Sequence, residues 1–143
     1  MIEKNILERR LRALEEYLRD LEETSNKINW NSFVEDKIMR RYVERTLQMA
    51  VEACLDIANH IISYEGYREP VDNKDTFSVL AENNIIYENL SENLKRMAKF
   101  RNIVVHDYLS VDPEIVYSIL NKHLADISTF ANTVKNSFLE GYN

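Results

Sequence analysis

The stretch FRNIVVHDYLSVDP, residues 100–113, carries the side chains of this sequence whose types and spacing could do chemistry. Arg101, Asn102, His106 and Tyr108 fall within eight positions of one another. Arginine can hold a phosphate and stabilise negative charge that develops on it, and histidine can transfer protons near neutral pH. Together they suit metal-free cleavage of a phosphodiester, in which an RNA 2′-hydroxyl attacks the neighbouring phosphorus. Asn102 and Tyr108 could orient the substrate or the histidine.

Other reaction classes lack the residues that they need. The three histidines, His60, His106 and His123, show none of the Cys, His or Asp spacing that is typical of zinc sites. The two glycines, Gly66 and Gly141, are too few for a phosphate-binding loop, and there is no nucleophile elbow. The sequence therefore predicts neither a bound metal nor a cofactor, and arginine with histidine is the chemistry that remains.

The composition indicates long helices joined by short loops. Of the 143 residues, 45% are hydrophobic and 29% are charged, but only two are glycine and two are proline. So little turn-forming material disfavours a sandwich or barrel of many strands. The single cysteine, Cys54, gives no disulfide framework, no apolar run approaches the roughly 20 residues that span a bilayer, and the N-terminus does not resemble a signal peptide. We expect one domain over residues 1–143, located in the cytoplasm and without membrane contact.

Apolar residues at intervals of three and four predict an all-α bundle of about five helices. The predicted helices cover residues 3–23, 33–64, 75–83, 87–106 and 113–138. Gly66 is expected to end the second helix in the left-handed conformation, and Asp112 with Pro113 to start the fifth. The polar side of the second helix, which includes Glu52, is expected to be solvated or to contact a second subunit.

Arg101 falls on the apolar face of the predicted fourth helix. Its neighbours on that face are Leu94, Met97, Ala98 and Val105. Burial of an arginine without a partner is costly. Either this face opens into a cleft, therefore, or an acidic group meets Arg101.

His106 does not share the face of Arg101. The two residues are about 140° apart around an ideal helix, whereas Tyr108 follows Arg101 by one heptad on the same face. Two alternatives would bring the histidine to the arginine. The helix could loosen near Val105, or a second copy of the chain could complete the site across a twofold axis.

The charge pattern bears on a nucleic-acid substrate. The net charge of −6 argues against general affinity for nucleic acid. Basic residues are nevertheless concentrated at Lys95, Arg96, Lys99 and Arg101. A cluster of this kind is as often a solvated helix face as a phosphate-binding one. We count Lys99 among the candidates for substrate binding.

The residues that could do chemistry also carry a family resemblance. RNIVVHDY, residues 101–108, matches the R-x4-H-x-Y signature of HepT-like proteins, which are the HEPN-domain toxins of type VII (HEPN/MNT) toxin–antitoxin systems. VERTLQMAVEACLDIANHIIS, residues 43–63, resembles the second helix of that family, and MAKFRNIVVHDY, residues 97–108, resembles its motif helix. The resemblance covers nearly the whole chain.

The resemblance implies a homodimeric, HEPN-like helical bundle with paired motifs in a cleft between the subunits. It also implies a metal-independent endoribonuclease in which Arg101 and His106 are the catalytic pair. Tyr108 would match the tyrosine to which the partner, a minimal nucleotidyltransferase antitoxin, attaches AMP. The attached nucleotide would neutralise the toxin because it places a bulky anion in the RNA cleft.

Two other functions stay open on the sequence. The chain could be a non-catalytic module that binds a nucleotide, or docks onto a minimal nucleotidyltransferase, without cutting RNA. It could also be a helical scaffold in which the motif only packs. In a scaffold, Arg101 would form a salt bridge with an acid on another helix, and Tyr108 would pack as most tyrosines do.

Overall fold

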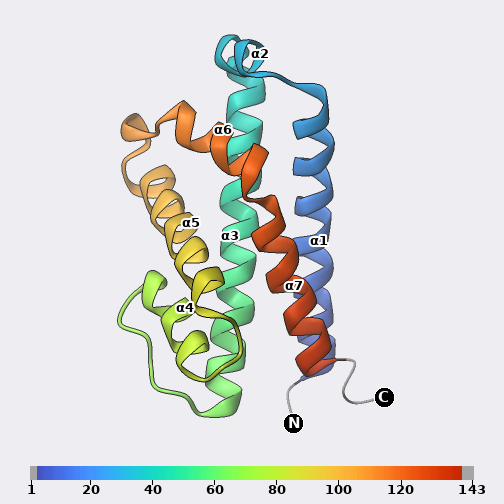
Figure 1. Ribbon diagram of the computed structural model, residues 1–143, viewed down its shortest axis with the longest axis vertical. Coiled ribbons are helices and arrows are strands. Elements are labelled where there is room, and N and C mark those ends of the chain that lie inside the picture. The colour runs from blue at the N-terminus through green and yellow to red at the C-terminus, as the bar shows by residue number, and fades with distance from the viewer. Residues whose placement is uncertain (1–2, 140–143) are drawn as a thin grey trace.

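The described part of the chain, residues 3–139, forms seven α-helices and one short 3₁₀ turn in the computed structural model (Figure 1). The elements are α1 (Lys4–Lys27), α2 (Trp30–Glu35), α3 (Lys37–Glu65), α4 (Asn73–Glu82), α5 (Glu88–His106), η1 (Tyr108–Ser110), α6 (Pro113–Lys122) and α7 (Leu124–Phe138). The predicted all-α class is confirmed. Among these residues no helix is both long and apolar enough to cross a membrane.

The helix count exceeds the predicted five because a short helix, α2, precedes α3 and because the predicted last helix is divided into α6 and α7. The predicted helix from residue 33 begins only at Lys37, since Asp36 leaves the helical conformation and its side chain accepts a hydrogen bond from the Met39 N–H. A separate short helix, α2, precedes it, held by a reciprocal capping box between Asn29 and Ser32. The first helix, in turn, continues past the predicted end at residue 23 to Lys27.

The predicted helix over 113–138 is divided at His123. This residue has φ −123° and ψ 4°, outside the helical conformation. The Nδ1 atom of its ring lies 3.2 Å from the Oδ2 atom of Asp126, in the first turn of α7. The apolar spacing runs on through the break, so the spacing alone did not reveal it. Gly66, by contrast, ends α3 with φ 71°, as predicted.

Helix α3 is the centre of the bundle. Figure 1 shows it running the length of the molecule, with α1 and α7 on one side and α4 and α5 on the other, and it packs against all four. Ten of its apolar residues between Val43 and Ile62 are buried, and so are five leucines of α1. Phe77 of α4 and Phe130 of α7 meet edge to face across the core, with ring centroids 6.1 Å apart. Any residue of α5 that points toward α3 therefore enters a packed interface.

The residues of the motif lie where α5 ends. The helix stops at His106, because Asp107 adopts φ −148° and ψ 59°, and the chain then makes the 3₁₀ turn η1. Asp112 caps the following helix by accepting a hydrogen bond of 2.9 Å from the Glu114 N–H, with Pro113 in the first helical turn. The predicted start of this helix is confirmed, and the cap fixes the direction in which the chain leaves the motif.

The Asp112 cap can be tested by substitution. Replacing Asp112 with alanine removes the acceptor and should lower the free energy of unfolding by about 1 kcal/mol, measured by urea denaturation. Asp112→Asn keeps an acceptor and should unfold close to the wild type. Equal losses in the two variants would show that the side-chain hydrogen bond does not hold this end of α6.

Candidate active site

Arg101 points from α5 toward α3 and is largely buried. Its Nη2 atom lies 3.5 Å from the Oε2 atom of Glu52, and its Nη1 atom donates to the Oδ1 atom of Asn102 at 3.1 Å. The Nε atom is buried and has no partner among the described residues. Of the two arrangements that the sequence allowed for Arg101, the structure thus contains the acidic partner. Its 3.5 Å distance leaves the guanidinium with donor capacity for a phosphate.

Glu52 was expected to be solvated or to contact a second subunit, and the structure instead shows it partly buried against Arg101 of the same chain. It faces α5 within the same chain, half-buried, and its Oε1 atom accepts a hydrogen bond of 2.8 Å from Gln48. Asn102 links the motif to α4, because its Oδ1 atom also accepts a hydrogen bond of 3.4 Å from the side-chain amide of Asn73. Asn102 and Glu52 therefore fix where Arg101 points.

Tyr108 also reaches α3, through its hydroxyl group. The hydroxyl donates a hydrogen bond of 2.5 Å to the Oε1 atom of Glu44. Glu44 is only 5% exposed although it is a carboxylate, whereas Tyr108 is 46% exposed. The hydrogen bond to Glu44 raises the pKa of Tyr108 above its ordinary value and burial adds to the shift, while the nearby Arg41 guanidinium opposes it.

Three polar residues of α3 form a row that runs from the Tyr108–Glu44 contact to the Arg101–Glu52 contact. Glu44, Gln48 and Glu52 are spaced four residues apart, so they lie along one side of the helix and span about 12 Å. We call these three residues the α3 polar row. One end of the row meets Tyr108 and the other meets Arg101. The prediction that these two residues face the same way agrees with this geometry, although Tyr108 lies beyond the end of α5.

His106 is the last residue of α5 and is exposed. The helix is continuous from Glu88 to His106, so the loosening near Val105 that would turn the histidine toward Arg101 does not occur. No hydrogen bond or ion pair joins His106 to Arg101 within the described chain. Of the two routes to convergence that the sequence left open, only a second copy of the chain remains.

Lys99 shares the outer side of α5 with His106. The two are seven residues apart, which is two helical turns, and both are exposed. Nearby, Lys95 forms an ion pair with Glu92 at 3.0 Å, and Arg96 donates a hydrogen bond of 2.7 Å to Asn93. Lys99 has no ion-pair partner in the described residues, which leaves its charge available to a phosphate.

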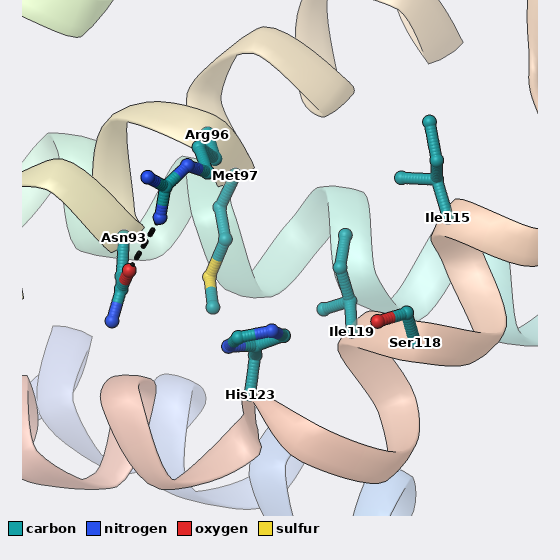
Figure 2. Close-up of a pocket in the computed structure, with 7 residues that line it drawn as sticks. All are labelled: Asn93, Arg96, Met97, Ile115, Ser118, Ile119 and His123. Atoms are coloured by element: carbon teal, nitrogen blue, oxygen red, sulfur yellow. Dashed lines mark hydrogen bonds between the residues drawn. The ribbon is translucent and has the colours of Figure 1, made fainter.

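A pocket lies beside the motif helix but does not include the motif. Figure 2 shows it between α5, α6 and the start of α7, with a volume of about 200 Å³. Met97 and Ile119 give it an apolar wall, and Arg96 donates a hydrogen bond to Asn93 at its edge. None of Arg101, His106 and Tyr108 lines it. Within residues 3–139, no group of three or more His, Cys, Asp or Glu side chains is placed to hold a metal ion.

Sequence reasoning missed Glu44, although a signal for it was present. Val43, Leu47, Val51 and Leu55 mark the buried stripe of α3, and Glu44 lies three residues before Leu47 and seven before Val51. An acid in such a stripe needs a partner as much as Arg101 does. The same argument that singled out Arg101 would have identified Glu44.

Comparisons with known proteins agree on one family. The family model described as "Ribonuclease HepT-like" matches residues 14–134. The chain is 40% identical over 105 residues to the mRNA nuclease HepT of Shewanella oneidensis, a match that covers 73% of this chain and 79% of that protein. It is 28% identical over 138 residues to the tRNA nuclease HepT of Aphanizomenon flos-aquae, covering 96% of this chain and 92% of that one.

Solved structures give the same result for the fold. A tri-AMPylated Shewanella oneidensis HEPN toxin in complex with MNT antitoxin superposes with a TM-score of 0.86. Its sequence is 32% identical, and the match covers 94% of this chain and 99% of that chain. A toxin–antitoxin complex with AMP-PNP superposes equally well, with a TM-score of 0.86 and 32% identity over 93% of this chain and 99% of that chain.

The contact between Tyr108 and Glu44 predicts an unusual titration. Because the carboxylate and burial both favour the protonated phenol, Tyr108 should ionise above the pH of about 10 at which free tyrosine titrates. The absorbance of tyrosinate, taken as the difference between wild type and Tyr108→Phe, measures this. Glu44→Gln should move the midpoint down. A midpoint at or below that of free tyrosine in the wild type would contradict the contact.

Proposed function

The chain belongs to the HepT-like ribonuclease family, and from this premise we propose that its single domain is the toxin of a type VII (HEPN/MNT) toxin–antitoxin pair and cleaves RNA without a metal ion. The observation that carries the proposal is the family match over residues 14–134, because that range contains the complete R-x4-H-x-Y segment. Two relatives that are named nucleases, one for mRNA and one for tRNA, support RNA as the substrate class.

In the proposed reaction, Arg101 holds the scissile phosphate. The guanidinium is already oriented by Asn102, and its 3.5 Å ion pair with Glu52 is long enough to yield to a phosphate oxygen. His106 transfers protons: it takes one from the 2′-hydroxyl, or gives one to the 5′-oxygen that leaves as the 2′-oxygen bonds to phosphorus. Lys99, on the same side of α5 as His106, attracts the neighbouring phosphates.

A homodimer would bring Arg101 and His106 together at one site. In one chain Arg101 points toward α3 while His106 points outward, so His106 is placed to serve the arginine of a second copy. The segments around the motif expose apolar side chains that a partner would cover. Leu109 is 99% exposed, directly after Tyr108, and Ile38 is 82% exposed near the start of α3. Exposed apolar groups of this kind are typical of an interface.

The proposal also includes modification of Tyr108 by an antitoxin. Its ring is half-exposed on η1, only two residues from His106, so a partner enzyme can reach it. An HEPN toxin that superposes on this chain is described as tri-AMPylated and in complex with MNT antitoxin. We infer that a nucleotidyltransferase adds AMP to Tyr108, and that the added phosphate and base exclude RNA from His106.

The ion pair between Arg101 and Glu52 is the contact expected of the helical scaffold, and it also fits the second candidate function, a non-catalytic module that docks onto a minimal nucleotidyltransferase. If the pair persists in solution, Arg101 is neutralised and no RNA phosphate is held. Assays of RNA cleavage separate the two functions.

The cleavage proposal predicts that His106→Ala loses activity. Removing a general acid or base costs about 10²–10⁴-fold in rate, and the circular dichroism spectrum should stay unchanged because the side chain is exposed. The measurement is the cleavage of RNA in EDTA, where the wild type should remain active. His123→Ala is the matched control, since that histidine lies away from the motif. An inactive wild type, or full activity in His106→Ala, would contradict the mechanism.

The shared site predicts complementation between two inactive chains. Arg101→Ala and His106→Ala should each be inactive alone. If each site takes its arginine from one subunit and its histidine from the other, a mixed dimer contains one intact site, so an equal mixture regains about a quarter of wild-type activity. The mixture should be measured after unfolding and refolding together. No regained activity, with mixed dimers shown by mass, would mean that both groups act from one chain.

A further inference from the structure

We propose that Glu44 is the general base that accepts the Tyr108 proton when the tyrosine oxygen attacks the α-phosphorus of a nucleoside triphosphate, and that Arg41 holds the phosphate. The inference rests on the proposed function, because it concerns how Tyr108 becomes modified. It assigns part of the transfer chemistry to the acceptor chain itself, whereas the modification alone requires only an exposed tyrosine.

Glu44 is in an environment that a merely structural residue would not need. It is 5% exposed on α3, next to the fully buried Val43 and Leu47. A buried carboxylate is costly unless a hydrogen bond satisfies it, and here the donor is the hydroxyl of Tyr108 at 2.5 Å. A leucine at position 44 would fill the stripe at lower cost. The carboxylate is therefore better explained by what it does to Tyr108.

The contact has the geometry of an activated nucleophile. A hydroxyl nucleophile requires a base within hydrogen-bond reach, and Glu44 Oε1 is within that reach of the Tyr108 hydroxyl. The base lies on α3, while Tyr108 as a whole is 46% exposed. A triphosphate can thus approach from solvent while the proton leaves toward α3. Because the pKa of Tyr108 is raised, the phenol is protonated at neutral pH and needs such a base.

Arg41 supplies the third group. It lies one turn before Glu44 on the same side of α3, and its side chain is exposed. Its guanidinium is close enough to the Tyr108 hydroxyl to oppose the rise in the pKa of that group. An arginine in this position can bind the α-phosphate oxygens and stabilise the charge that builds on them during transfer.

The proposed step balances without any redox partner. The bond between the Tyr108 oxygen and the α-phosphorus forms, and the bond from that phosphorus to the bridging oxygen of pyrophosphate breaks. The electron pair of the broken bond leaves with pyrophosphate. The phenolic proton moves to Glu44 and then to water. The triphosphate is bound by the nucleotidyltransferase partner, which places it against Tyr108.

The test follows AMP addition to the full chain by intact mass, with ATP, Mg²⁺ and the MNT-type partner. The wild type should gain AMP and Tyr108→Phe should not. Glu44→Gln keeps the shape but cannot take the proton, so the initial rate should fall by about 10²-fold or more, and Glu44→Asp should recover part of it. Asp56→Asn is the matched control, because that exposed carboxylate lies on the same helix away from Tyr108.

The kinetic constants of the variants separate a base from a structural support. If Glu44 takes the proton, the loss in Glu44→Gln should fall on kcat for AMP transfer with KM for ATP unchanged, and Glu44→Asp should recover part of kcat. Modification of Glu44→Gln at the wild-type rate would overturn the inference and leave the proposed function standing. A loss in Glu44→Gln that Glu44→Asp does not recover at all would also overturn it, because it would reduce Glu44 to a packing role. Failure of the wild type to gain AMP would overturn the inference and the proposed modification of Tyr108, whereas RNA cleavage has its own test.

Discussion

The site depends on the cost of placing charge inside the α3–α5 interface. Arg101 is largely buried on one side of that interface, and Glu44 is almost fully buried on the other. Neither can leave water without a partner, since an unpaired buried charge costs several kcal/mol. Arg101 is therefore tied to Glu52, and Glu44 to Tyr108. The ion pair and the hydrogen bond help to fix the position of the motif against the central helix, because each joins one side chain of the motif to one carboxylate of α3.

The same constraint divides the motif into an inner and an outer part. Arg101 and the hydroxyl of Tyr108 are held by the α3 polar row, while His106 and Lys99 stay on the outer side of α5. An unbroken helix cannot place both parts at one phosphate. Because of this division one chain presents only half of the proposed cleavage site, which is why we propose that a second copy completes it.

The sequence predicted the fold class, and an acidic partner as one of two arrangements for Arg101, because both follow from local patterns. The 3–4 spacing identifies buried helix faces, and an arginine among apolar residues marks a position that needs a partner. The break between α6 and α7 at His123 was not predicted, since the apolar spacing continues through it. Glu52 was misplaced because helix periodicity shows the face of a residue but not the element opposite, and α5 covers a part of α3 that looks solvated on a wheel. Glu44 was missed although it stands in the buried stripe, where the rule applied to Arg101 also applies.

The α3 polar row would serve both of the proposed reactions on one surface. In the proposed cleavage, Arg101 is freed from Glu52 and His106 is open to solvent, whereas in the proposed modification Tyr108 is oriented by Glu44. The two carboxylates lie about 12 Å apart on one rigid helix. An AMP on Tyr108 would add negative charge two residues from His106, next to Arg41, on a chain whose net charge is already −6. If the substrate is RNA, local basic residues must attract it to this acidic protein, so we expect one added phosphate at this place to repel the substrate as well as to block it.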